Sequence, residues 1–276
     1  MNAPSPHTAH ADRSLLFSVA DGVATLVLNR PTSLNALDAG LVDEIVDALG
    51  RIRADASVRA VLLRGAGDAF CAGGDIRVTA AAGPRTAEQG RSTLERFRRL
   101  TTDLHQLDRP LIAAVDGVAY GAGFSLLLLA DIVLLSSRAR LCMAFQRVGL
   151  VPDCGALFTL PRIVGLQRAK ELMLSGREIG ADEALAMGIA MEVLPPSALH
   201  ERAWRIARSF GGASPLALSA TKRALNASLQ SDLQTMLELE ASAQGIALSS
   251  DYVRDASARI AAKATPAFAW PRREAS

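Results

Sequence analysis

A chain of 276 residues, half of them hydrophobic and only 4% aromatic, is long enough to bury a large core built mainly from aliphatic side chains. Its 30 Lys and Arg nearly balance 28 Asp and Glu, and a net charge of +2 argues against nucleic acid or a membrane surface as partner. The longest apolar stretch, 124–130, is far shorter than the roughly 20 residues that a membrane-spanning helix needs. We therefore predict a globular protein with no transmembrane segment.

Neither the N-terminal residues nor the cysteines indicate a particular chemistry. Residues 1–13 are rich in Pro, His and Ser and have no apolar run of signal-peptide length, so a disordered lead-in is expected. The three cysteines, Cys71, Cys142 and Cys154, are odd in number and lack metal-binding spacing. We interpret them as reduced thiols of a cytoplasmic protein.

The first predicted element is a hairpin over 14–29, because two β-rich runs flank the turn dipeptide Asp21-Gly22. Amphipathic helices then alternate with buried strands, which is typical of an α/β fold. The expected helices and strands are 38–52 and 59–64, 94–107 and 111–115, and 123–130 and 132–135, with a further strand near 140–144. From residue 154 onward nearly everything is predicted to be helical.

Two small-residue turns, 69–76 and 118–124, share one pattern, a β-rich run followed by glycines and the start of a helix. Amide groups at a helix start have no acceptor within the helix, so two such turns brought together make an oxyanion hole. Either turn alone is equally well explained by glycines that let a strand and a helix approach closely.

Taken together and in this order, five segments resemble the successive motifs of the enoyl-CoA hydratase/isomerase (crotonase) family. They are NRPTSLNAL, FCAGGDI, AAVDGVAYGAG, ADI and VGLVPDCG, and the resemblance spans about residues 14–268. It implies a crotonase-like ββα spiral core over 14–199 that contains an acyl-CoA site. A helical C-terminal region over 200–276 would then build a homotrimer or a homohexamer.

The resemblance also implies the binding residues. The two oxyanion amides fall on Gly74 and Ala122, where alanine stands at a position often occupied by glycine. The channel for the coenzyme A moiety falls on Ser33, Leu34, Ala72, Asp75 and Ile76, mostly through their backbone. Lys263 falls where the family often places a cation near the phosphates, although a solvated lysine at a helix end explains it equally well. No metal and no cofactor beyond the coenzyme A of the substrate are expected.

Two glutamates that hydratases of this family use to move water and a proton are missing. Their positions carry Ser125 and Phe145, and Phe145 is expected to line an apolar acyl pocket. Addition of water needs groups that activate water and transfer a proton, so the sequence argues against efficient hydration.

Asp153, in the VPDCG turn, is the remaining candidate for a catalytic carboxylate. The run MAFQRVGLVPDCG particularly resembles the isomerases of phenylacetate degradation, which implies that Asp153 carries a proton between two carbons of an enoyl-CoA. The competing interpretation is a helix N-cap. Asp131, in the ADI motif, is expected to be structural, and Ser125 to be an ordinary packed serine.

Two other functions remain open. The chain could be a slow hydratase or another lyase of the same family, or a CoA-binding subunit without chemistry of its own.

Overall fold

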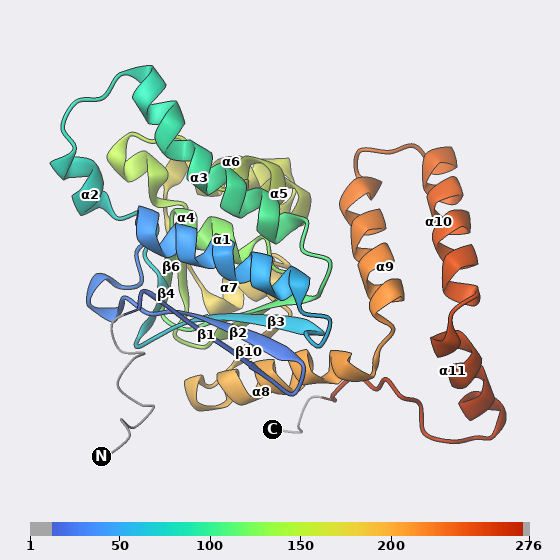
Figure 1. Ribbon diagram of the computed structural model, residues 1–276. Helices are drawn as coiled ribbons and strands as arrows, with labels where there is room; N and C mark the ends of the chain where they lie inside the picture. Colours follow the sequence, from blue (N-terminus) through green and yellow to red (C-terminus); the bar gives the residue numbers. More distant parts are fainter. Residues whose placement is uncertain (1–12, 273–276) are drawn as a thin grey trace, which may run out of the picture.

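The structure is a computed structural model that describes residues 13–272 (Figure 1). It begins with the predicted hairpin, in which β1 (Leu15–Ala20) pairs antiparallel with β2 (Val23–Leu28). The turn residues have positive φ angles, 47° at Asp21 and 75° at Gly22, as a two-residue hairpin turn requires. The expected lead-in lies outside the described residues except for its last residue, Arg13.

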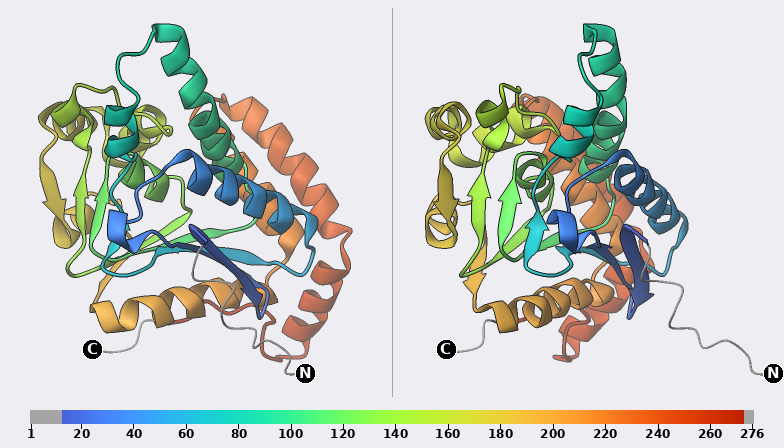
Figure 2. Two further views of the ribbon diagram at one scale, coloured as in Figure 1. Left: turned by 60° about the vertical axis from the view of Figure 1, so that its left-hand side comes forward. Right: turned by 90° about the vertical axis from the view of Figure 1, so that its left-hand side faces the viewer.

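A six-stranded sheet forms the centre of the fold, in the order β1-β2-β3-β5-β7-β10. From β2 onward its strands are parallel: β3 (Ala60–Gly65), β5 (Leu111–Val115), β7 (Ile132–Ser136) and β10 (Glu192–Leu194). Helices α1 (Ala39–Ala54) and α3 (Ala87–His105) cover it and pack on each other (Figures 1 and 2). Asp38 caps α1 by accepting from the amide of Leu41 at 2.9 Å.

A second sheet has the order β4-β6-β8-β9. It contains β4 (Ala69–Cys71), β6 (Val118–Tyr120), β8 (Arg140–Cys142) and the antiparallel edge strand β9 (Glu178–Gly180). The pairs β3/β4, β5/β6 and β7/β8 each give one strand to each sheet, so the chain winds as the expected spiral of ββα turns. The predicted fold class is confirmed.

Short helices connect the turns of this spiral. They are α2 (Ile76–Ala81), α4 (Ala122–Leu127), α5 (Ala156–Val164), α6 (Leu166–Ser175) and α7 (Ala181–Ala186), with 3₁₀ turns at Pro31–Ser33, Ala144–Val148 and Phe210–Gly212. The expectation of almost uninterrupted helix after residue 154 is wrong at β9 and β10. Each has three residues, and its extended conformation depends on pairing with β8 or β7 rather than on its own sequence.

The expected boundary at residues 199/200 falls within α8 (Pro196–Ser209). This helix lies across the large sheet, where Leu199 and Ile206 pack in a second hydrophobic cluster with Leu62, Ile112 and Leu134. Three further helices follow: α9 (Pro215–Ser228), α10 (Leu233–Leu248) and α11 (Asp251–Ala261). None of the three contains a buried residue, and they extend to one side of the core (Figure 1).

No helix within residues 13–272 is long and apolar enough to cross a membrane.

Candidate active site

The first glycine-rich turn connects β4 to α2 and is held by the segment that follows the hairpin. The amide of Ala72 donates to the carbonyl of Leu34 at 2.9 Å, and the amide of Leu37 donates to the carbonyl of Gly73 at 2.7 Å. Gly73 has a φ of 98°, which a residue with a side chain rarely adopts. The conformation of the backbone after β4 is therefore held by these hydrogen bonds and requires a glycine at Gly73.

The second glycine-rich turn connects β6 to α4 and lies directly beside the first. A Cβ atom on Gly73 would lie 2.7 Å from the carbonyl oxygen of Tyr120, and one on Gly123 would lie 2.2 Å from that of Cys71. Both contacts are too short for a real side chain. Strands β4 and β6 are parallel, so both turns begin at the same, C-terminal, end of their strands.

The amides predicted to form an oxyanion hole are unpaired. Among residues 13–272, neither the N–H of Gly74 nor that of Ala122 has a hydrogen-bond acceptor. Gly74 is solvent-exposed, and Ala122 is the first residue of α4, where amides point out of the helix. Ala122 has no positive φ angle, so alanine fits where the family often has glycine.

The residues expected to contact coenzyme A gather around the first turn. Leu34 and Ile76 are about half exposed, at 49% and 51%, and provide apolar surface, and the backbone of Leu34 is hydrogen-bonded to that of Ala72. Ser33 precedes Leu34 and donates its hydroxyl to the carbonyl of Arg30.

Asp75 has a structural side chain. It caps α2 through the amide of Arg77 and binds the guanidinium groups of Arg77 and Arg30 at 3.0 and 3.1 Å. Hydrogen bonds from Arg77 lower the pKa of Asp75 to about 2, with a smaller contribution from Arg30. Its carboxylate is thus fully occupied, and its backbone is also paired, since the N–H donates to the carbonyl of Leu37 and the C=O accepts from the amide of Val78.

The two positions at which the resemblance predicts a glutamate in hydratases carry no carboxylate here. Ser125 is completely buried in α4, and its hydroxyl donates to the carbonyl of Gly121 at 3.2 Å. Phe145 is buried beside the second turn, with its ring 3.9 Å from where a Cβ of Gly121 would lie. Phe145 therefore contributes an apolar wall next to the oxyanion turn.

Asp153 is partly buried in the turn before α5, and its Oδ1 is fully buried without a hydrogen-bond partner. The N-cap of α5 is Gly155, with no side-chain cap, and Asp153 contributes only its carbonyl, which accepts from Ala156 at 3.1 Å. The interpretation of Asp153 as a helix cap is therefore wrong. Burial raises the pKa of Asp153, as it does for any carboxylate removed from water.

A cavity of about 300 Å³ opens beside Asp153. Its other walls come from α3 and from the turn itself: Leu94, Phe97, Arg98, Thr101, Thr102, Cys154 and Gly155. The sequence predicted Leu94 and Phe97 only as part of an amphipathic helix. Their role as cavity walls depends on how α3 packs across the chain, which no local pattern encodes.

Cys154 follows Asp153 in this turn, and its thiol is buried. Burial raises the pKa of the Cys154 thiol, and the neighbouring carboxylate of Asp153 raises it further.

Asp131 has the structural role that the sequence predicts. One oxygen, Oδ2, accepts both from the amide of Leu111 and from the ammonium group of Lys222, each at 2.7 Å. This joins β5 to α9.

Replacing Asp131 by alanine is expected to lower the free energy of unfolding by about 2 kcal/mol, since a charged acceptor of two hydrogen bonds is lost. The kcat should not change. Thermal denaturation and steady-state kinetics check this, and a loss of kcat in a variant as stable as wild type would contradict it.

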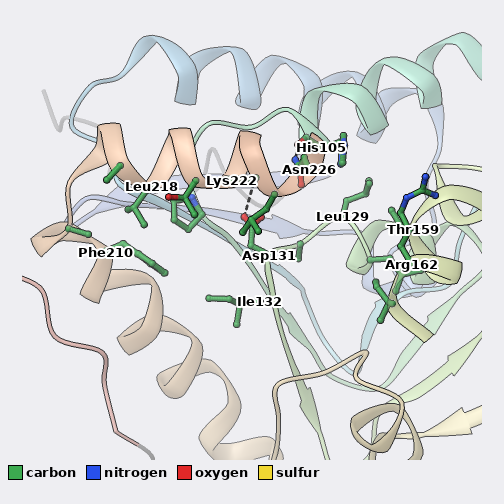
Figure 3. Close-up of a pocket in the computed structure, with 18 of the residues that line it drawn as sticks. His105, Leu129, Asp131, Ile132, Thr159, Arg162, Phe210, Leu218, Lys222 and Asn226 are labelled. Carbon is green, nitrogen blue, oxygen red and sulfur yellow. Dashed lines mark hydrogen bonds and ion pairs between the residues drawn. The ribbon is translucent and has the colours of Figure 1, made fainter. Parts of the chain in front are cut away.

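A larger cavity, of about 690 Å³, lies between the core and α9 (Figure 3). The Asp131–Lys222 pair lies in its wall together with Leu129, Arg162 and Leu218. None of the residues assigned to the oxyanion turns lines either cavity, and the smaller cavity is associated with the candidate chemistry through Asp153 alone.

Lys263 follows the end of α11, with a φ of 54°. Helix α11 lies at the opposite end of the molecule from α2 (Figure 1). Within one chain, Lys263 is therefore not brought together with the other expected binding residues.

The chain is similar to known proteins over most of its length. The chain is 36% identical over 256 residues to the 1,2-epoxyphenylacetyl-CoA isomerase of Escherichia coli (strain K12), covering 92% of this chain and 97% of that protein. It is equally identical, over 239 residues, to the short-chain-enoyl-CoA hydratase of Clostridium acetobutylicum, covering 85% of this chain and 89% of that one.

A crystal structure of an enoyl-CoA hydratase/isomerase from Cupriavidus metallidurans CH34 superposes with a TM-score of 0.91 at 45% identity, covering 95% of this chain and 98% of that one. Residues 18–270 match the enoyl-CoA hydratase/isomerase family as a whole. With two facing turns, two unpaired amides and this match over most of its length, the chain belongs to the enoyl-CoA hydratase/isomerase family.

Proposed function

We propose that this protein is an acyl-CoA isomerase that moves a double bond by proton transfer. The observation that carries the proposal is the buried, unpaired Oδ1 of Asp153, in a chain whose two glutamate positions hold Ser125 and Phe145. One carboxylate suffices to shift a proton between two carbons, whereas hydration also requires an activated water.

In the proposed mechanism the thioester oxygen lies between the amides of Gly74 and Ala122. These donors stabilise the negative charge that develops on the oxygen when the neighbouring carbon loses a proton. Asp153 accepts that proton and returns it to the carbon two positions away, which leaves the mass of the substrate unchanged. The raised pKa of Asp153 makes its carboxylate a stronger base than an exposed aspartate.

For binding, we propose that the exposed surface around Leu34, Ala72 and Ile76 takes the coenzyme A moiety and that the cavity beside Asp153 takes part of the acyl group. Phe97 and Leu94 give that cavity an apolar wall suited to a hydrocarbon chain or a ring. The E. coli relative is named for a ring epoxide of phenylacetyl-CoA, and an aromatic-degradation intermediate is therefore our preferred class of substrate.

We propose no cofactor other than the coenzyme A of the substrate. Three buried free thiols suit a reducing compartment, and we propose the cytoplasm.

The proposal is tested by incubating the protein with a panel of enoyl-CoA and ring-epoxide CoA thioesters and measuring the masses of the products by mass spectrometry. Isomerisation leaves the mass unchanged, while hydration adds that of water. A hydratase is the second candidate, because relatives of that name are 36–38% identical to the chain and the unpaired Oδ1 is also able to hold a water. If the panel gives only products that have gained water, the hydratase function would replace the isomerase function proposed here.

We also propose that the chain assembles into a trimer or a pair of trimers through its last helices. Several large apolar side chains in and between α9 and α10 are exposed in one chain, namely Leu225, Leu229, Leu233, Leu237, Ile246 and Leu248. Exposure of this many large apolar side chains on neighbouring helices favours an interface between subunits.

Replacing Leu233, which is 75% exposed, by glutamate is expected to convert the assembly into folded monomers. Leu174 on α6 is 69% exposed, so Leu174→Glu makes a matched control that should keep the assembly. Light scattering coupled to size exclusion measures both. A wild-type protein that is monomeric at micromolar concentration would contradict the proposed trimer.

A further inference from the structure

Tyr120 is the last residue of β6 and immediately precedes the turn that carries the Ala122 amide. A Cβ atom on Gly73 of the first turn would lie 2.7 Å from the carbonyl oxygen of Tyr120 and 3.4 Å from the nitrogen of Ala122. The backbone of Tyr120 and the Ala122 amide are therefore packed directly against the first glycine-rich turn. A shift of Tyr120 would move the Ala122 amide relative to that turn.

The turn after Tyr120 has a backbone conformation that depends on its surroundings. Gly121 has a φ of 49° and a ψ of −122°, and its amide donates to the carbonyl of Cys142 on β8 at 2.8 Å. Glycine adopts many other conformations as readily, so the turn has little conformational preference of its own. Its geometry is set by the contacts that the neighbouring strands make with it.

The side chain of Tyr120 reaches across the small sheet to the edge strand. Tyr120 pairs in register with Cys142 of β8, and Cys142 pairs with Glu178 of β9, so the three side chains form one row on the same face. The hydroxyl of Tyr120 donates to Oε2 of Glu178, while Arg140 donates to Oε1 at 2.6 Å. The tyrosine thus joins β6 to β9 across β8.

Glu178 belongs to a segment that is itself held in place. The carbonyl of Gly176, two residues earlier, accepts from the buried thiol of Cys142 at 3.1 Å and from Nε of Arg147 at 3.0 Å. Burial, together with the hydrogen bond and charge of Glu178, raises the pKa of Tyr120 to about 12, so its hydroxyl keeps its proton at neutral pH. The hydroxyl therefore remains a donor to a fixed carboxylate.

We propose that Tyr120 is a positioning residue: its hydrogen bond to Glu178 holds the second glycine-rich turn against the first and so fixes the Ala122 amide as an oxyanion donor. This inference rests on the proposed function. Loss of the hydroxyl leaves the donor present but less well aligned. Because an oxyanion donor acts mainly on charge that develops during the reaction, Tyr120→Phe is expected to lower kcat roughly three- to tenfold with little change in KM.

The test is the infrared spectrum of phenylacetyl-CoA, labelled with carbon-13 at its thioester carbonyl, in the presence of the protein. This thioester has no enoyl double bond to move. Hydrogen bonds from the oxyanion amides lower the stretching frequency of the carbonyl, by an amount that depends on their lengths and angles. The wild-type protein is expected to lower the frequency, and Tyr120→Phe to lower it less. A role limited to packing would reduce the melting temperature of Tyr120→Phe but leave the frequency and kcat at their wild-type values, and that result would overturn the inference.

Tyr252→Phe is the matched control, because it removes the hydroxyl of the other tyrosine in the chain, which donates to the carbonyl of Gly212 at 2.9 Å. It should change neither the frequency nor kcat. Glu178→Ala is expected to reproduce the effect of Tyr120→Phe, whereas Glu178→Gln keeps an acceptor and should retain most of the wild-type lowering. The double variant with Tyr120→Phe and Glu178→Ala should have the kcat of the single variants, since both remove the same hydrogen bond. Additive losses would show that the two side chains act separately and would contradict the proposed role.

Ala122→Pro separates this inference from the proposed function. If the proline variant lowers the carbonyl frequency less than wild type does, while Tyr120→Phe lowers it fully, only the positioning role is wrong. If the wild-type protein leaves the carbonyl at its frequency in water, the oxyanion hole of the proposed function fails, and the positioning role fails with it.

Discussion

Asp153→Asn is expected to reduce the turnover of an enoyl-CoA on the order of 100-fold or more, which is typical for the loss of a general base. Asparagine has nearly the same size but cannot accept the proton as a carboxylate does. Binding of acyl-CoA should remain, because the amides of Gly74 and Ala122 and the surface around Leu34 are unchanged. Steady-state kinetics and a binding titration with an unreactive acyl-CoA measure the two effects separately.

The same variant is expected to be more stable than wild type at neutral pH. Burial raises the pKa of Asp153, so the folded protein binds this proton more tightly than the unfolded chain does, and ionisation destabilises the fold. The destabilisation grows as the pH rises from the pKa of Asp153 in the unfolded chain, about 3.9, through its higher pKa in the folded protein. It is complete above both pKa values. Asp153→Asn should therefore gain in melting temperature at pH 7 and lose that gain below about pH 4. Wild-type turnover combined with reduced stability would indicate a structural role instead.

Ala122→Pro is expected to lower kcat by roughly 100- to 1000-fold, the usual effect of removing one oxyanion donor. Ala122 is the first residue of α4, the helix position at which proline is best tolerated, and its amide bonds to nothing else within residues 13–272. The substitution should therefore remove the donor with little effect on the fold.

Ala122→Gly provides the matched control for the oxyanion donor. It keeps the amide and loses only a methyl group, so its kcat should stay close to that of wild type. Circular dichroism and thermal denaturation verify that both variants are folded. A proline variant with near-normal kcat would show that the Ala122 amide is not a donor in the reaction.

Local patterns predicted the elements that local chemistry determines. Asp21-Gly22 indicates a two-residue turn because both positions require positive φ, and Asp38 marks the start of α1 because its side chain satisfies a free amide. Strands β9 and β10 were missed because three residues carry no periodicity, and their partners lie far away in the sequence.

For the candidate site, the resemblance to a family predicts roles for Gly74, Ala122 and Asp153, and those roles stay predictions. The structure shows that the first two residues have free amides and the third an unpaired oxygen. The position of Thr101 in the cavity wall beside Asp153 was not predicted, because it depends on how a helix some 50 residues earlier in the chain packs against this turn. For Lys263 the resemblance predicted a binding residue, but within one chain Lys263 follows α11, which lies at the opposite end of the molecule from α2.

The central claim, that Asp153 carries a proton between two carbons of an acyl-CoA, is tested most directly with a 3-enoyl-CoA that carries deuterium on the carbon next to the thioester. The wild-type protein is expected to give a 2-enoyl-CoA without added water, in which one deuterium has moved two carbons away or been lost to solvent. Asp153→Asn should leave the label in place. A wild-type product that has gained water, or a substrate that binds and keeps its deuterium where it started, would contradict the account.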